Sequence, residues 1–224
     1  MFKCIIFDLD GTLVDSEGLN VRALSELIET ADISTEDLKN TYRGWKLSAI
    51  VDDIVKKYKI TIPDNFIASY RQHVGQMYRT ELKAFVGVTE VLQTTKIPVC
   101  VASNAPLQKI VAALEITNLG RFFGRKLFSA YDIGSWKPDP ELFLTAARAM
   151  NVQPHECLVV EDSAAGVQAA MAARMYCLKF LPNIGPRNEE LCSFSDYSEF
   201  YVAVDDLVKN SKASSPPCYQ NMGR

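Results

Sequence analysis

Two aspartates, Asp8 and Asp10, stand one residue apart in the stretch FDLDGT, directly after an apolar run at the start of the chain. Two carboxylates this close together repel each other and are unfavourable to bury. The pair suits a reaction in which one carboxylate attacks as a nucleophile while the other moves a proton. Gly11 follows them and permits the turn that would bring both side chains to one pocket.

The segments that would position this pair predict an α/β fold. Helical patterns alternate with the later of five short apolar stretches. The predicted strands are residues 3–9, 97–103, 126–132, 157–161 and 175–181, and the helices between them are 104–119, 139–150 and 163–174. This alternation indicates a Rossmann-like, doubly wound parallel sheet with helices on both faces. In such sheets the ligand lies beyond the carboxyl ends of the strands.

Polar side chains occupy those predicted strand ends. Ser103 and Asn104 follow the second strand, Lys137 follows the third, and Glu161 and Asp162 follow the fourth. The four carboxylates among these residues, Asp8, Asp10, Glu161 and Asp162, would form an acidic cluster that is unfavourable without a shared cation. Oxygen ligands favour a hard ion, and Mg²⁺ suits a site that also binds phosphate. We expect Lys137 to neutralise a phosphoryl group, and Ser103 and Asn104 to hold its remaining oxygens.

The pattern predicts phosphoryl transfer through a covalent intermediate. Asp8 would attack and form an aspartyl-phosphate, while Asp10 would protonate the leaving oxygen and later deprotonate the attacking water. Each motif alone has an ordinary structural explanation, such as a solvated turn or a helix cap. Their joint occurrence at consecutive strand ends favours the catalytic interpretation.

The first crossover is unusually long. About 85 residues lie between Leu9 and Lys96, although a crossover helix needs only about a dozen. The interval is filled by helical patterns at residues 19–30, 34–42, 47–58 and 64–82. We therefore predict a helical cap at residues 15–83, inserted into a core made of residues 1–14 and 84–210. Residues 211–224 have the composition of a weakly structured tail.

The motifs FDLDGT, ASN (102–104), KPDP (137–140) and VVEDSAAG (159–166) resemble the haloacid dehalogenase superfamily of aspartate-nucleophile phosphatases. The resemblance is to its subgroup with a helical C1 cap after the first strand. It implies that Asp8 is the nucleophile and that Asp10 is the acid/base. It also implies that Ser103 and Lys137 hold phosphate. The implied Mg²⁺ ligands are Asp8, the backbone carbonyl of Asp10, Glu161 and Asp162.

Two longer stretches narrow the resemblance. RGWKLSAI (43–50) and LFSAYDIGSWKPDPELF (127–143) resemble bacterial 6-phosphogluconate phosphatases. The β-phosphoglucomutases have a similar architecture, but they carry a histidine where Asn20 stands and an arginine near Leu47. These departures favour a phosphatase, with a sugar-phosphate mutase as the alternative.

The cap of such an enzyme is expected to read the substrate. Two cations and an indole around a glycine could grip the carboxylate or hydroxyls of a sugar acid phosphate, or could form a helix–helix turn with a packed tryptophan. These residues are Arg43, Gly44, Trp45 and Lys46, with Glu17 and Asn20 as further candidates on the segment that enters the cap.

Composition limits the remaining possibilities. The formal net charge of −3 gives no electrostatic case for nucleic acid or an anionic membrane. No apolar run reaches the length of a membrane span, and the N-terminus lacks a signal-peptide pattern. The six cysteines form no CxxC pair, which favours reduced thiols. We therefore expect a cytoplasmic, monomeric enzyme acting on a small phosphorylated metabolite.

A phospho-accepting receiver domain is the alternative from another functional class. Such domains also place acidic residues, a hydroxyl and a lysine at strand ends. They lack both the helical insert and a pair equivalent to Glu161 and Asp162.

Overall fold

A computed structural model describes residues 2–28, 33–42, 45–182 and 192–213. At its centre lies a parallel sheet of six strands in the order β3-β2-β1-β4-β5-β6. The strands are β1 (Cys4–Phe7), β2 (Val99–Ser103), β3 (Leu127–Ser129), β4 (Cys157–Glu161), β5 (Tyr176–Phe180) and β6 (Ser193–Phe194). The strand order reverses at β1, so the ends of β1, β2 and β4 lie next to one another, where a ligand site is expected.

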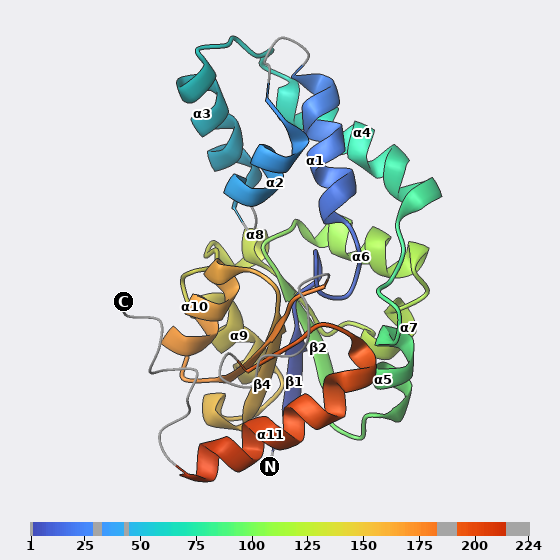
Figure 1. Cartoon of the computed structure of the whole chain (residues 1–224), viewed down its shortest axis with the longest axis vertical. Helices are drawn as coiled ribbons and strands as arrows, with labels where there is room; N and C mark the ends of the chain where they lie inside the picture. The colour runs from blue at the N-terminus through green and yellow to red at the C-terminus, as the bar shows by residue number, and fades with distance from the viewer. Residues whose placement is uncertain (1, 29–32, 43–44, 183–191, 214–224) are drawn as a thin grey trace.

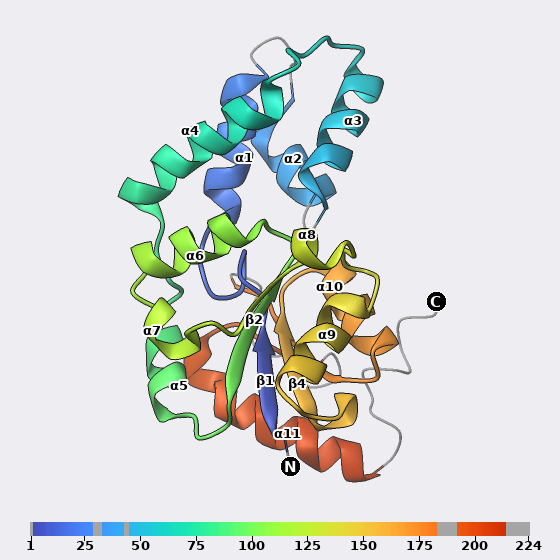
Figure 2. The same cartoon turned by 180° about the vertical axis from the view of Figure 1, so that it is seen from behind.

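Helices cover both faces of the sheet (Figures 1 and 2). On one face lie α5 (Val88–Thr94), α6 (Leu107–Ile116), α7 (Gly120–Phe123) and α11 (Phe200–Ala213). On the other face lie α8 (Ala130–Ile133), α9 (Glu141–Ala149) and α10 (Ala164–Ala172). Two short 3₁₀ turns, η1 (Pro154–Glu156) and η3 (Tyr197–Glu199), complete the described connections.

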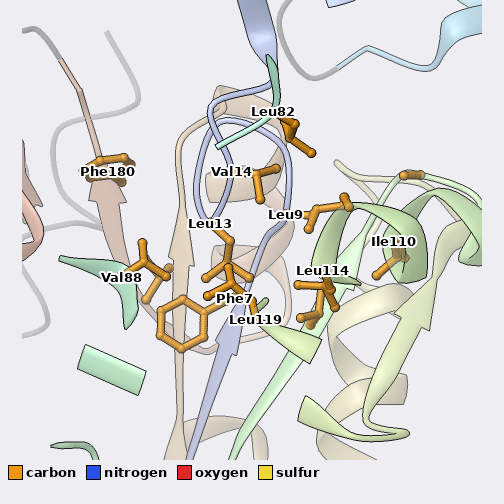
Figure 3. Packing of buried hydrophobic residues seen from close by; sticks show 14 of the residues in the cluster. Phe7, Leu9, Leu13, Val14, Leu82, Val88, Ile110, Leu114, Leu119 and Phe180 are labelled. Carbon is orange, nitrogen blue, oxygen red and sulfur yellow. The ribbon is translucent and has the colours of Figure 1, made fainter. Parts of the chain in front are cut away.

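Alternating strand residues supply the two halves of the core, as the side-chain period of two requires. Phe7 and Leu9 are fully buried with Leu114 of α6 and Val88 of α5 on the first face (Figure 3). On the second face Ile6 packs with residues of α9 and α10. Burying one such side chain contributes about 1.5–3 kcal/mol. The strand ends are thus held by a packed layer on each side.

Four further helices lie together beyond the carboxyl ends of the strands (Figure 1). They are α1 (Glu17–Leu27), α2 (Thr35–Tyr42), α3 (Leu47–Tyr58) and α4 (Phe66–Glu81), called here the α1–α4 group. Their apolar sides are buried against one another at positions such as Leu24 and Val74. The two chain segments that join this group to the sheet run side by side, since Val14 bridges Ala84.

Most predicted elements are present, and the differences have local causes. The third predicted strand is cut to Leu127–Ser129, because Ser129 Oγ accepts the backbone N–H of Tyr131 and starts α8. The helices α5 and α11 and the strand β6 are absent from the sequence prediction, as are the short helices α7 and α8. β6 has two residues, too few to show a period. The helix α11 extends through Ala213, so it runs into the segment 211–224 that the sequence predicts to be weakly structured.

Four buried cysteines, Cys4, Cys100, Cys157 and Cys177, are free thiols as predicted. Cys192 is disulfide-bonded, so the prediction of reduced thiols is wrong for that residue. Among the described helices, none combines the length and apolar character needed to cross a membrane.

Candidate active site

Asp8 follows the last residue of β1, and its position is fixed by the neighbouring strand, because its backbone N–H donates to the carbonyl of Val160 at 3.0 Å. Its side chain is buried beside Lys137, whose Nζ donates to Asp8 Oδ1 at 2.5 Å. Burial raises the pKa of Asp8 to about 7 and the Glu161 carboxylate adds to the rise, although Lys137 opposes it. An additional cation would therefore be needed to keep Asp8 ionised below neutral pH.

Lys137 links two carboxylates. Its Nζ also donates to Glu161 Oε1 at 2.7 Å, and 2% of its side chain is exposed. Burial alone would lower the pKa of Lys137, but the charges of Asp8 and Glu161 raise it above its usual value. The Lys137 backbone N–H donates to Asn104 Oδ1 at 2.9 Å. The Asn104 amide thus holds the segment that carries the ammonium.

Glu161 is the last residue of β4, Asp162 follows it, and both are buried. The second oxygen of Glu161 accepts from the backbone N–H and the hydroxyl of Ser163 at 2.7 and 2.8 Å. A Cβ at Gly166 would lie 1.9 Å from Glu161 Cδ, and one at Gly11 would lie 2.4 Å from Asp162 Oδ2. Both glycines are therefore needed to let these carboxylates approach the backbone.

The residues present fit a hard divalent cation. One oxygen each from Asp8, Glu161 and Asp162 lies within 4.8 Å of the others, and all three side chains are buried. Lys137 balances one of these three negative charges. The remaining charge and the all-oxygen donor set match the preferences of Mg²⁺.

Polar groups from three segments surround the Asp10 carboxylate. Lys109 Nζ in α6 donates to Oδ2 at 2.8 Å. Ser16 Oγ and the Tyr78 hydroxyl of α4 lie 2.5 and 3.3 Å from Oδ1. Burial disfavours ionisation of Asp10, but the Lys109 charge and the hydrogen bonds from Lys109 and Ser16 lower its pKa below the usual value.

A cavity of about 510 Å³ connects the strand ends with the α1–α4 group. Its lining includes Asp8, Asp10, Ser103 and Lys137 on the sheet side. The helix side contributes Glu17, Asn20, Trp45, Lys46 and Arg71, among others. The cavity is therefore lined by the strand-end carboxylates with their lysine partners and by further cations of the helix side.

Two cations of the α1–α4 group lie against aromatic rings of the sheet side. Lys46 Nζ is 3.7 Å from the centroid of the Trp136 ring. Arg71 donates to the Tyr131 hydroxyl at 3.2 Å. Both cations line the cavity, so these contacts place positive charge beside aromatic side chains.

Comparisons with known proteins agree with this geometry. A family model described as haloacid dehalogenase-like hydrolase matches residues 2–174. The chain belongs to this family. The 6-phosphogluconate phosphatase of Escherichia coli K12 is 35% identical over 192 residues, which cover 84% of this chain and 86% of that protein.

Two further relatives of this haloacid dehalogenase-like hydrolase extend the comparison. The validoxylamine A 7'-phosphate phosphatase of Streptomyces hygroscopicus subsp. limoneus is 30% identical, covering 80% of this chain and 85% of that protein. A haloacid dehalogenase-like protein of unknown function from Agrobacterium tumefaciens superposes with a TM-score of 0.81 at 25% identity, covering 93% and 100% of the two chains. Family and relatives identify the enzyme as a phosphatase, and its fold as the Rossmann-like fold of this family.

The structure brings most of the predicted site residues of this hydrolase to one cavity. Asp8, Lys137, Glu161 and Asp162 form the buried cluster, and Ser103 lies at the end of β2 with its Oγ accepting the N–H of Ala105 at 3.2 Å. Trp45, 48% exposed, packs edge-on against Tyr42. The predicted residues Arg43 and Gly44 lie outside the described residues.

Lys109, Tyr78 and Ser16 were not predicted, although they contact Asp10. Tyr78 and Lys109 stand 68 and 99 residues from Asp10 in the sequence, so no local pattern connects them. The one available signal is a cation in the first turn of the largely apolar helix LQKIVAALEI.

Proposed function

We propose that this enzyme is a Mg²⁺-dependent phosphatase that hydrolyses a small phosphorylated sugar or sugar acid through an aspartyl-phosphate on Asp8. The observation that carries the proposal is the buried Asp8 carboxylate, held by Lys137 within the cluster of Glu161 and Asp162. The paired aspartates and the ammonium are the groups that a two-step displacement requires.

The first step forms a bond between an Asp8 oxygen and the substrate phosphorus and breaks the bond from phosphorus to the sugar oxygen. Lys137 binds Asp8 Oδ1, which would leave Oδ2 to attack. Asp10 gives a proton to the departing sugar oxygen. Because Lys109 keeps Asp10 ionised in the free site, that proton must enter with the substrate, whose phosphate titrates near pH 6.

The second step returns the enzyme to its starting state. Asp10 takes a proton from water, the water oxygen attacks phosphorus, and the bond to Asp8 breaks to release phosphate. Ser103 and Lys137 would hold the phosphoryl oxygens in both steps. When bound by Asp8, Glu161, Asp162 and the Asp10 carbonyl, Mg²⁺ would neutralise the charge that develops on the phosphoryl group.

The α1–α4 group supports a sugar acid as substrate. We propose that residues 15–83 form a cap over a core of residues 1–14 and 84–210, and that Lys46, Trp45 and Glu17 contact the substrate. Lys46 offers a cation inside the cavity, and a carboxylate at the far end of the substrate would pair with it. The identity to a 6-phosphogluconate phosphatase agrees with this class.

Phosphate release from 6-phosphogluconate, from neutral sugar phosphates and from p-nitrophenyl phosphate tests the function, with Mg²⁺ and with a chelator. Asp8→Asn should abolish turnover of each substrate, whereas Asp52→Asn, at an exposed position on α3, should not. Full activity of Asp8→Asn would contradict the nucleophile assignment. Formation of glucose 6-phosphate from glucose 1-phosphate would instead indicate a mutase.

The sugar-acid assignment has its own test. Lys46→Met should raise KM for 6-phosphogluconate roughly tenfold, the scale of one charged hydrogen bond, and should leave KM for glucose 6-phosphate nearly unchanged. An equal rise for both substrates would contradict pairing of Lys46 with the carboxylate.

A further inference from the structure

We propose that Lys109 is a positioning residue that fixes the orientation of the Asp10 carboxylate for proton transfer. The inference rests on the proposed function, in which Asp10 is the acid/base. It adds a residue of α6 that lies outside the strand-end motifs. Its basis is the 2.8 Å ion pair between Lys109 Nζ and Asp10 Oδ2 in the wall of the cavity.

The hydrogen bonds divide the two oxygens of Asp10 between different donors. Oδ1 has Ser16 and Tyr78 nearby, but the Tyr78 hydroxyl carries one proton and lies closer to Asn20 Oδ1, at 2.8 Å, than to Asp10, at 3.3 Å. The Tyr78 proton therefore goes to Asn20. Ser16 then holds Oδ1, and among the described residues Lys109 alone donates to Oδ2.

A carboxylate held at both oxygens cannot turn about its Cβ–Cγ bond, whereas one held only by Ser16 can. Proton transfer requires the acid/base to stay within about 2.6–3.2 Å of its partner atom. A misplacement of about 1 Å can slow a reaction about 100-fold. Losing the Lys109 contact would therefore act on the rate of the proton-transfer steps.

Lys109 is itself held in place. It lies in the first turn of α6, where its backbone N–H donates to Pro106 at 2.9 Å. Its ammonium lies 5.5 Å from the centroid of the Tyr78 ring, and 27% of its side chain is exposed. The pair is thus partly buried between α4 and α6 and differs from a freely solvated surface ion pair.

A substrate-binding role for Lys109 makes a different prediction. A cation that held the substrate would affect KM when removed, since its contact would be lost in the bound ground state. A cation that orients Asp10 would affect kcat, because substrate binding does not depend on the carboxylate orientation.

The test compares Lys109→Met, Lys109→Arg and the exposed control Lys96→Met, using a sugar phosphate and p-nitrophenyl phosphate. For the sugar phosphate, we expect Lys109→Met to lower kcat about 30-fold with KM within twofold, and Lys109→Arg to recover most of the loss. With p-nitrophenyl phosphate, nitrophenolate leaves without a proton. Its pre-steady-state burst should therefore keep its rate constant, while the steady state, which needs water deprotonation, slows.

Several outcomes would overturn the inference in an active enzyme. They are an unchanged kcat in Lys109→Met, a rise in KM alone, or an equal slowing of the burst and the steady state. If Lys109→Met does not fold, as thermal unfolding would show, Lys109→Gln takes its place, and the same kinetic outcomes decide. Absence of Mg²⁺-dependent phosphate release by the wild type would instead refute the proposed function, so the two failures are distinguishable.

Discussion

Asp8 should destabilise the metal-free protein, and its replacement by asparagine should therefore raise the free energy of unfolding. The folded-state pKa of Asp8 is raised from 3.8 to about 7. A carboxyl with a raised folded pKa favours folding when protonated, so its contribution to stability falls as the pH rises from about 4 to about 7. At pH 8 the difference of about 3 pKa units corresponds to roughly 4 kcal/mol.

Asparagine resembles the protonated carboxyl in size, and Lys137 keeps Glu161 as a partner at 2.7 Å. The new amide also presents a donor toward the Lys137 ammonium, which costs about 1–2 kcal/mol. We therefore expect Asp8→Asn to be more stable than the wild type by roughly 2 kcal/mol at pH 8, or about 4–8 °C in Tm for a chain of this size.

Thermal unfolding followed by circular dichroism in a chelating buffer measures this effect at pH 8 and pH 5, with Asp52→Asn as the control. The gain should nearly vanish at pH 5, where Asp8 of the folded wild type is protonated. Mg²⁺ should stabilise the wild type more than Asp8→Asn. Equal stability at pH 8, or a gain of the same size at both pH values, would refute the electrostatic reasoning.

Three further perturbations follow from the same cluster. Lys137→Met removes the cation from three buried carboxylates and should cost about 3–5 kcal/mol of stability; Mg²⁺ should restore part of the stability in thermal unfolding but not the activity. Gly166→Ala forces Glu161 aside and should weaken Mg²⁺ binding, measured by calorimetry, at least tenfold. The control Gly18→Ala places a Cβ where nothing lies within 4 Å, and it should leave Mg²⁺ binding unchanged. Because Mg²⁺ favours ionised Asp8, raising its concentration should move the acidic limb of the kcat/KM profile to lower pH, and a limb that stays fixed would argue against Asp8 as a metal ligand.

Much of the acidic cluster could be predicted because the topology determines it. Parallel strands bring their carboxyl ends to one edge, so Asp8, Ser103 and Glu161 are neighbours once the strands are recognised. Lys137 follows α8, beyond the end of β3, and Asn104 holds its backbone. Strand recognition required only continuous apolar runs. Three residues of the predicted Mg²⁺ ligand set, Asp8, Glu161 and Asp162, lie together and are buried. The roles of the individual residues stay proposals.

The contacts of individual side chains could not be predicted in the same way. The phosphate-binding role of Asn104 stays a prediction, and its amide oxygen also accepts the backbone N–H of Lys137, a contact that the sequence does not show. Position at a strand end does not determine a rotamer. Tyr78 reaches Asp10 only because α4 packs over α6, a relation between helices that neither helix sequence contains. The cytoplasmic location and the monomeric state stay predictions.

The two aspartates of FDLDGT have opposite pKa shifts, and these shifts explain why the site needs a cation. In the proposed mechanism Asp10 exchanges protons and Asp8 attacks as an anion. Lys109 keeps Asp10 ionised, while burial pushes Asp8 toward protonation. Lys137 alone does not bring the pKa of Asp8 back to its usual value, because the Lys137 ammonium also pairs with Glu161. A divalent cation beside Asp8 would restore the ionised carboxylate, whereas Asp10 already has Lys109 as its partner. The metal would thus act on the attacking carboxylate as well as on the phosphoryl group.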